Sequence, residues 1–248
     1  MKQYKNYVFD LYGTLVDIKA DEKDKTFWEK ISELYSHFGV DYTKSEIEKT
    51  YKEYVKEEEE KLVEKNGSPY PEIELERVFI RLFTEGKNKH NTKIKIPDLD
   101  SWAVSMAAFF RVESREYIKP YKDTIDTLKE LKRRGVRIYL LSNAQKCFTQ
   151  AEMEITGVEP YLDDIFLSSD YEIKKPDPRF LQELIKKHGL RKEETVMVGN
   201  DTISDIGIAE AVGIDSILIN TFKYSNEYIK KTCKKEPVVI NTLKELLD

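Results

Sequence analysis

The sequence predicts an α/β protein in which a parallel sheet is interrupted by a helical insert. Short apolar runs alternate with amphipathic helical patterns in the first residues and in the second half of the 248-residue chain. This alternation is typical of parallel strands joined by crossover helices. Residues 17–115 instead carry several helical patterns and no convincing strand run. The chain is long enough to bury a full core and still hold such an insert.

Six runs of apolar or β-branched residues are predicted as strands. They span residues 7–10, 136–142, 165–168, 195–199, 216–220 and 238–240. The helix expected before the second strand is clear, because Ile125, Leu128 and Leu131 share one face. Gly135 follows and can end that helix. We expect right-handed crossovers between the strands.

The insert is predicted from apolar residues that recur at helical spacing. The two clearest stripes contain Phe27, Ile31, Leu34, Tyr35 and Phe38, and then Ile47, Tyr51, Tyr54 and Val55. Such stripes are the buried faces of amphipathic helices. We therefore expect a core made of residues 1–16 and 116–248 and a helical domain made of residues 17–115.

Composition narrows the class of partner. The formal net charge is −5, with 40% hydrophobic and 35% charged residues. An acidic chain without a concentrated basic patch is not expected to bind nucleic acid or an anionic membrane. No run approaches the roughly 18 apolar residues of a membrane span, and no apolar leader precedes the first strand. We expect a cytoplasmic protein that acts on a small molecule.

Polar side chains follow the first two strands at the points where they end. Asp10 comes directly after an apolar run and is followed by Gly13, while Ser142 and Asn143 close the second strand. Open α/β sheets bind ligands at the carboxyl ends of their strands. Gly13 lets the backbone turn so that its amides face an anion, and the Ser142 hydroxyl can bind an anionic oxygen. A nucleophilic aspartate is typically mounted in this way.

The third and fourth strands are also followed by groups suited to anion chemistry. Lys175 precedes Pro176, which fixes the turn, and its ammonium can neutralise both a nucleophilic carboxylate and an incoming anion. Residues 199–205 form an acidic loop that opens a helix. Oxygen ligands of this kind suit Mg²⁺.

These four motifs together resemble those of the haloacid dehalogenase superfamily. They are Asp-x-x-Gly-Thr at 10–14, Ser-Asn at 142–143, Lys-Pro at 175–176 and the acidic Gly-Asn-Asp loop at 199–201, in that order after four strands. The resemblance covers the core at both ends and leaves the insert unmatched. It implies a Rossmann-like core with a helical cap over the active site.

The resemblance also implies roles for individual residues. Asp10 would be the nucleophile that forms a covalent aspartyl intermediate, Lys175 its electrostatic clamp, and Thr14 and Ser142, with Asn143, the anion-binding groups. A Mg²⁺ site would use Asp10, the carbonyl oxygen of Tyr12 and Asp201, with Asp205 and Asn200 as further candidates. For Asp205, bracing Lys175 is an equally good role.

Tyr12 stands where a phosphatase of this superfamily has a second aspartate. That aspartate protonates the leaving alkoxide and later activates water. A phenol with a reference pKa of about 10 hardly supplies a base at neutral pH. A halide leaving group needs no proton, and dehalogenating members of the superfamily resemble this chain in having a tyrosine here. The residue therefore favours a metal-free 2-haloacid dehalogenase.

The acidic loop favours the opposite conclusion, because phosphoryl transfer needs a divalent cation and halide displacement does not. The dehalogenases also carry an arginine early in the cap, whereas the first arginine here after Asp17 is Arg77. We therefore expect a Mg²⁺-dependent phosphatase of a small phosphorylated metabolite. A metal-free dehalogenase, and a ligand-binding member that has lost turnover through Tyr12, stay as alternatives.

Overall fold

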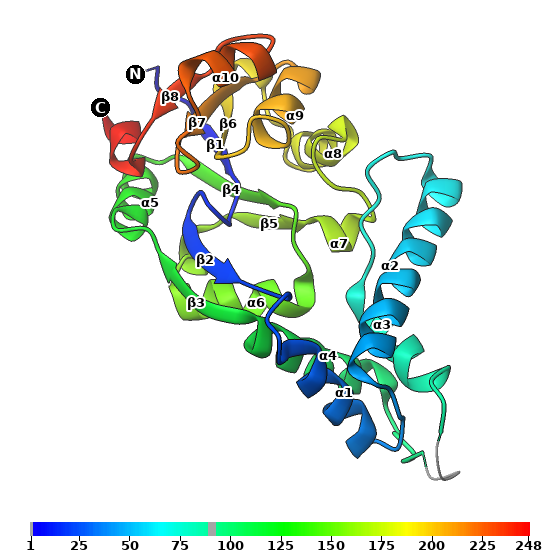
Figure 1. The fold of residues 1–248 in the computed structure, drawn as a ribbon. Coiled ribbons are helices and arrows are strands. Elements are labelled where there is room, and N and C mark those ends of the chain that lie inside the picture. Colours follow the sequence, from blue (N-terminus) through cyan, green and yellow to red (C-terminus); the bar gives the residue numbers. More distant parts are fainter. Residues whose placement is uncertain (1, 89–92) are drawn as a thin grey trace.

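A six-stranded parallel sheet forms the centre of the computed structural model, which describes residues 2–88 and 93–248 (Figure 1). The strand order is β5-β4-β1-β6-β7-β8, and every neighbouring pair is parallel. The strands are β1 Asn6–Phe9, β4 Arg137–Ser142, β5 Asp164–Leu167, β6 Thr195–Gly199, β7 Asp215–Ile219 and β8 Val238–Ile240. All six were predicted from the sequence, each within one residue at either end. The α/β class is confirmed.

Helices cover both faces of this sheet. They are α5 Thr124–Arg133, α6 Lys146–Thr156, α7 Ser168–Tyr171, α8 Pro178–His188, α9 Asp205–Val212 and α10 Asn226–Thr232, with short 3-10 turns at Glu159–Tyr161, Lys192–Glu194 and Leu243–Leu247. The alternation of side chains along β1 decides which face packs where. Phe9 lies in a cluster with Leu128 of α5, whereas Val8 lies in a cluster with Leu181 of α8. All four residues of β1 are buried, as expected for a central parallel strand.

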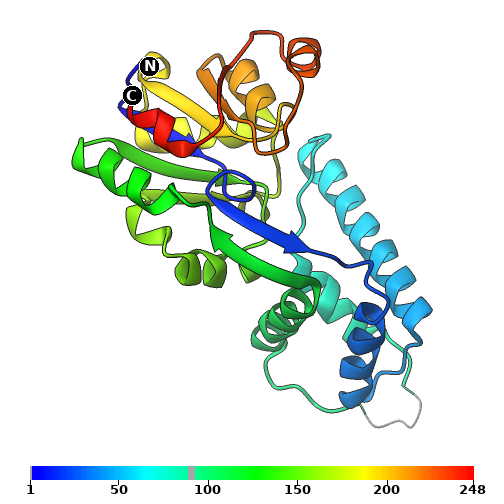
Figure 2. The same ribbon diagram turned by 60° about the vertical axis from the view of Figure 1, so that its left-hand side comes forward.

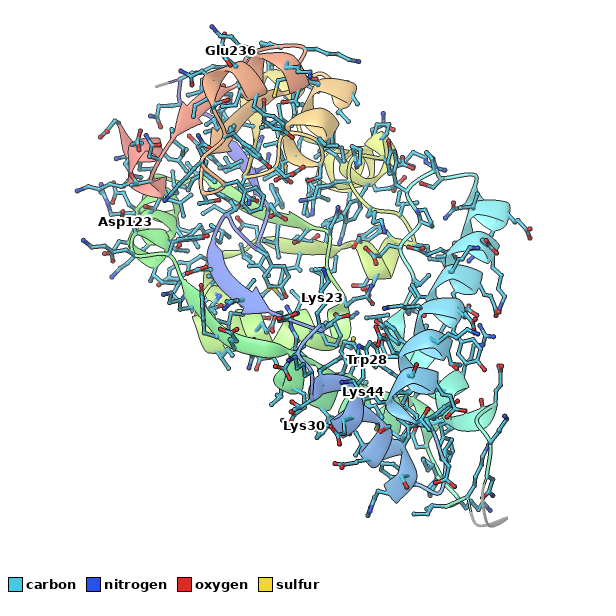
Figure 3. All side chains as sticks on the ribbon, viewed as in Figure 1. Lys23, Trp28, Lys30, Lys44, Asp123 and Glu236 are labelled. Carbon is cyan, nitrogen blue, oxygen red and sulfur yellow. The ribbon has the colours of Figure 1, made fainter. Side chains whose placement is uncertain are left out.

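Four further helices form a separate apolar cluster at one end of the molecule (Figure 1). They are α1 Phe27–His37, α2 Lys44–Asn66, α3 Leu75–Thr84 and α4 Leu99–Ser114. Aromatic rings fill their centre: Phe110 contacts Phe27 edge to face at 4.9 Å, and Trp28 contacts Tyr51 at 5.1 Å. Figure 3 shows Trp28 among these helices and Lys44 near the start of α2. The division of the chain at residues 17 and 115 stays a prediction.

Two strands that the sequence did not predict connect the sheet with α1–α4 (Figure 2). β2 Val16–Ala20 pairs antiparallel with β3 Arg115–Pro120, with a shift of register at Lys19 and Ala20. The expectation that residues 17–115 contain no strand was wrong for β2. The reason is that this ribbon buries only Val16, so neither strand shows the apolar alternation from which strands are recognised.

A second connection runs through the segment between α2 and α3. Pro71 forms an antiparallel bridge with Ile173, and the Lys174 amide donates to the Tyr70 carbonyl at 3.0 Å. The hydroxyl of Ser68 donates to Asp177 in a buried contact. These contacts come from residues 66–73, which we call the 66–73 segment. In Figure 1 the chain after α2 approaches the segment between α7 and α8.

Within the described ranges, 2–88 and 93–248, none of the helices combines the length and the apolar character that crossing a membrane would need.

Replacing Phe110 by Ala should destabilise the protein by about 3–5 kcal/mol, because a buried ring at the centre of α1–α4 is lost. Val112 lies on the same helix with 60% of its surface exposed, so Val112→Ala should change stability by less than about 0.5 kcal/mol. Urea unfolding of the three proteins measures both. Equal losses for the two variants would contradict the packing described for α4.

Candidate active site

The carboxyl edge of the sheet brings four polar side chains together. Asp10 follows β1, Ser142 ends β4, and Lys175 and Asp205 lie in the segments after β5 and β6. Because β4, β1 and β6 are adjacent and parallel, their ends meet at one edge. The Asp10 amide extends the pairing by donating to the Val198 carbonyl at 3.0 Å. The order of the strands therefore delivers the predicted catalytic residues to one place.

The two carboxylate oxygens of Asp10 have different surroundings. Oδ1 accepts from the Ser142 hydroxyl at 2.9 Å and from Lys175 Nζ at 2.7 Å. No residue in the described part of the chain donates to Oδ2. The residue is 7% exposed. One oxygen thus fixes the orientation of the carboxylate, while the other has no such bond in the described ranges.

Lys175 is a buried cation next to Asp10, with 3% of its surface exposed. Its Nζ donates to Asp10 at 2.7 Å, to Asp205 at 2.7 Å and to the Leu141 carbonyl at 2.8 Å. Three acceptors satisfy the three donors of an ammonium. Burial alone would lower the pKa of Lys175, but the charges of Asp10 and Asp205 outweigh it and hold the pKa above its ordinary value. The residue is therefore a permanent cation at neutral pH.

Asn143 holds the backbone that carries this lysine. Its amide nitrogen donates to the Lys175 carbonyl at 3.0 Å, and its amide oxygen accepts from the Lys175 amide at 2.7 Å. The Lys175–Pro176 peptide bond is cis. Through these two bonds Asn143 positions Lys175. Its role in binding substrate stays a prediction.

Asp205 braces the lysine from the opposite side. Its Oδ1 pairs with Lys175, and its Oδ2 accepts from the Asp201 amide at 2.9 Å. Burial raises the pKa of Asp205, with Lys175 opposing the shift and Asp10 reinforcing it. A Cβ at Gly199 would overlap the Asp205 side chain, so glycine is needed there for this approach. Both oxygens of Asp205 are engaged, which favours bracing over metal ligation.

The rest of the acidic loop is organised by its own backbone. Asp201 Oδ1 accepts from the amides of Ile203 at 2.9 Å and Ser204 at 2.6 Å, and the Tyr224 hydroxyl lies 3.3 Å from Oδ2. The hydroxyl of Thr14, predicted to bind an anion, instead donates to the Asn200 amide oxygen at 3.3 Å. The Asn200 amide nitrogen is buried and has no acceptor among the residues that the structure describes.

A cation could be held here by oxygen atoms of Asp10, Asp201 and the Tyr12 carbonyl, which is a donor set of the kind Mg²⁺ prefers. Asp10 Oδ2 has no donor among the described residues, and Asp201 Oδ2 has only the long contact from Tyr224. No group of three or more His, Cys, Asp or Glu side chains in the described ranges could by itself hold a metal ion. The chemistry of the donors fits, with water and substrate oxygens needed to complete the shell.

The phenol of Tyr12 is bonded to α6. Its hydroxyl lies 3.0 Å from the Thr149 hydroxyl and donates to the carboxylate of Glu152. Burial raises the pKa of Tyr12, and the charge of Glu152 raises it further. A phenol held in this way stays protonated and donates to Glu152. This hydrogen bond connects Tyr12 to α6 and has a structural role.

Glu152 is the centre of a buried ion cluster that sequence reasoning missed. With 2% exposure, it accepts from Arg111 Nε at 2.7 Å and Nη2 at 3.1 Å, and from Arg115 Nη1 at 2.8 Å. Burial alone would raise the pKa of Glu152, but Arg111 holds it below its ordinary value. The Arg111 guanidinium lies 5.5 Å from the centre of the Tyr12 ring. The sequence contained a signal only in Arg111 and Arg115, one helical turn apart; nothing in it pointed to Glu152.

A cleft of about 410 Å³ opens beside Tyr12 and Asn143. It is bounded by β2, α2, α4 and the loop that leads into α6, and its lining residues are Tyr12, Ile18, Ala20, Glu22, Val55, Glu59, Glu72, Ile73, Leu75, Arg111, Asn143, Ala144, Gln145 and Phe148. A larger hollow of about 570 Å³ lies between α1 and α2 and contains none of the motif residues. The cleft beside Tyr12 and Asn143, which are close in sequence to Asp10 and Ser142, is therefore the candidate substrate site.

The fold and the site define an α/β protein in which an aspartate paired with a buried lysine lies at the carboxyl edge of a parallel sheet, with a cleft lined by Tyr12 and Asn143. The chain belongs to the haloacid dehalogenase-like hydrolase family, whose model matches residues 4–213. The resemblance of the four motifs is thus confirmed over most of the chain.

Known proteins similar to this chain differ in their reactions. Over 135 residues the chain is 32% identical to a glyceraldehyde 3-phosphate phosphatase of Methanocaldococcus jannaschii, a match that spans 53% of this chain and only 56% of that protein. Over 234 residues it is 25% identical to the pyrimidine 5'-nucleotidase PynA of Streptococcus pneumoniae, covering 90% and 86% of the two chains. The structure of a 2-haloacid dehalogenase from Pseudomonas syringae pv. Tomato DC3000 is similar in fold, with a TM-score of 0.62 at 17% identity and coverage of 99% and 98%.

Gly13→Ala should cost about 2 kcal/mol more than Gly135→Ala. Both glycines have positive φ, +80° and +77°, so both variants incur the same backbone strain of about 1–2 kcal/mol. Only at Gly13 would the added Cβ overlap a neighbour, the buried Asn200 side chain, whereas nothing lies within 4 Å at Gly135. Thermal or urea unfolding gives the difference. Equal losses would show that Asn200 yields without cost.

Proposed function

We propose that this protein is a Mg²⁺-dependent phosphatase of small phosphorylated molecules and acts through a covalent intermediate on Asp10. One observation carries the proposal: Asp10 Oδ1 is held by Ser142 and Lys175, whereas Oδ2 has no donor among the described residues. The phosphatase names of the two relatives reported above support it. A nucleophilic carboxylate needs this combination of fixed orientation and one reactive oxygen.

In the first step the carboxylate of Asp10 attacks the phosphorus atom, and the bond from phosphorus to the alcohol oxygen breaks. Lys175 offsets the negative charge that would otherwise repel an anionic substrate from Asp10. The Ser142 hydroxyl keeps the attacking carboxylate in place. Mg²⁺, held by Asp10, Asp201 and the Tyr12 carbonyl, would supply charge neutralisation of the phosphoryl oxygens. Water then cleaves the acyl phosphate, which releases phosphate and restores Asp10.

The alkoxide that leaves in the first step must gain a proton. The Tyr12 phenol is committed to Glu152 and its pKa is raised, so it is poorly suited to donate one. The proton then has to come from water or from the substrate itself. We therefore propose that the rate depends strongly on the leaving group, with phenolic esters cleaved faster than alkyl esters.

A second candidate is a metal-free 2-haloacid dehalogenase. Tyr12 favours it, because halide needs no proton to leave. Arg111 also lines the cleft, although its guanidinium is already bound to Glu152 through two nitrogen atoms. A third candidate is a ligand-binding protein without turnover.

Asp10→Asn should lower Mg²⁺-dependent hydrolysis of p-nitrophenyl phosphate at least about 10³-fold, because the amide is not a nucleophile. Removal of Mg²⁺ with a chelator should abolish the wild-type rate. Asp17→Asn makes the same chemical change at an aspartate of β2. It serves as the control and should retain the rate. Release of halide from 2-chloropropionate without metal, together with no phosphate release at any pH, would overturn the proposal in favour of the dehalogenase.

Tyr12→Phe should leave p-nitrophenyl phosphate turnover within about threefold of wild type and destabilise the fold by about 1–2 kcal/mol, because it removes one donor from buried Glu152. Tyr12→Asp should raise the turnover of alkyl phosphates by about 10²-fold, since it restores a carboxyl group for proton transfer. Steady-state kinetics on both ester types measures these effects, with exposed Tyr117→Phe as the control. An unchanged alkyl rate in Tyr12→Asp would place the bottleneck elsewhere.

A further inference from the structure

The cleft beside Tyr12 and Asn143 has an acidic wall on the side of the helical part of the molecule. Three carboxylates line it, from Glu22, Glu59 and Glu72, against one guanidinium, from Arg111. This composition is unexpected for a site that receives an anionic phosphate ester. The wall concerns the alcohol part of the substrate, which leaves in the first step, and its interpretation rests on the proposed phosphatase function.

Glu72 is placed in this wall by contacts on both sides of it. Its amide pairs with the Glu172 carbonyl at 3.3 Å, next to the bridge between Pro71 and Ile173. Its carboxylate accepts from Gln145 Nε2 at 2.7 Å and from the Ser168 hydroxyl at 2.9 Å. The 66–73 segment thus carries a carboxylate from the helical part of the molecule to the loop that follows Asn143.

No cation lies within ion-pair distance of Glu72 in the described ranges. Lys174 is the cation that acts on the pKa of Glu72, and its ammonium lies 3.5 Å from the carboxylate of Glu59. Burial raises the pKa of Glu72, while Lys174, Ser168 and Gln145 partly oppose the shift. A carboxylate that is half buried without a paired charge costs free energy unless a ligand supplies the partner.

Both carboxylate oxygens of Glu72 accept from neutral donors, which fix the side chain but leave its charge without a paired cation in the described ranges. Arg111 is held by Glu152 through two nitrogen atoms, so its charge is largely compensated from behind the cleft. Glu22 forms no ion pair in the described residues. Burial raises its pKa, and Arg111 and Lys52 oppose this shift only from longer range. The wall therefore keeps a negative surplus where the leaving group of a substrate would lie.

We infer that Glu72 determines specificity by binding a protonated amine on the alcohol part of the substrate, with Glu22 adding to the same field. The substrate class is then phosphate monoesters of amino alcohols or amino sugars. The phosphoryl group binds beside Lys175 and the ammonium binds beside Glu72. Esters whose alcohol part carries a carboxylate meet like charge at this wall and are poor substrates.

Two matched pairs of esters test this on the full chain with Mg²⁺. O-phosphoethanolamine and phosphoglycolate have two-carbon skeletons that end in an ammonium or a carboxylate. Glucosamine 6-phosphate and glucose 6-phosphate differ only in the ammonium or hydroxyl at one carbon. The amine should have the higher kcat/KM by about tenfold or more in each pair. A ratio near one in both pairs, or a preference for the carboxylate, overturns the inference.

Glu72→Gln tests the residue itself, because it keeps the shape of the side chain and removes its charge. The amine preference should fall about tenfold, mainly through a higher KM for the amine. Glu60→Gln, an exposed glutamate on α2 outside the cleft, removes the same charge and should keep the preference. A Glu72→Gln protein that retains the full preference overturns the role of Glu72, and the wild-type ratios decide the substrate class if this variant does not fold.

The same assays separate the two proposals. Hydrolysis of p-nitrophenyl phosphate without an amine preference removes the specificity inference and leaves the phosphatase intact. No hydrolysis of any ester removes the phosphatase, and the specificity inference falls with it.

Discussion

The ammonium of Lys175, enclosed by Asp10, Asp205 and the Leu141 carbonyl, is the interaction on which the candidate site depends. A buried cation is tolerated only when its charge is compensated and each of its donors has an acceptor. Here the compensation comes from the end of β1 and from the start of α9, and the carbonyl comes from β4. Removing the ammonium would leave two buried carboxylates, Asp10 and Asp205, without a compensating charge. The orientation of Asp10 and the packing of the surrounding strand ends therefore depend on the same ammonium.

The same lysine links the site to α1–α4. Asn143 holds its backbone from one side, and the backbone pairing of residues 70–72 with residues 172–174 ends directly before it. Buried Ser68 and Asp177 close the other side of this loop. A displacement of the helices relative to the sheet would have to break these contacts or move the Lys175 loop. The position of the helical part and the charge balance at Asp10 are thus mechanically connected.

Local patterns were enough to predict the sheet and the motif residues, because each strand is short, apolar and ended by a polar group. Asp10, Ser142, Lys175 and Asp205 meet because their strands are adjacent, which follows from the alternating topology. β2 was missed since an exposed ribbon carries no periodic apolar signal. The cluster around Glu152 was missed for another reason: it joins residues about 40 and 140 positions apart, and no local spacing records such contacts.

Charge is arranged unevenly across the cleft, and this arrangement has a consequence for orientation. Lys175 lies beside Asp10 with its charge compensated by Asp10 and Asp205, whereas Glu22 and Glu72 in the cleft wall have no paired cation in the described ranges. An ester with a cation on its alcohol part would be attracted to this wall, and so oriented, before any specific contact forms. Tyr12 lines the same cleft and stays neutral, since its phenol donates to Glu152. An aspartate at that position would add negative charge to the cleft, so the tyrosine lacks a group suited to proton transfer but leaves the cleft less negative.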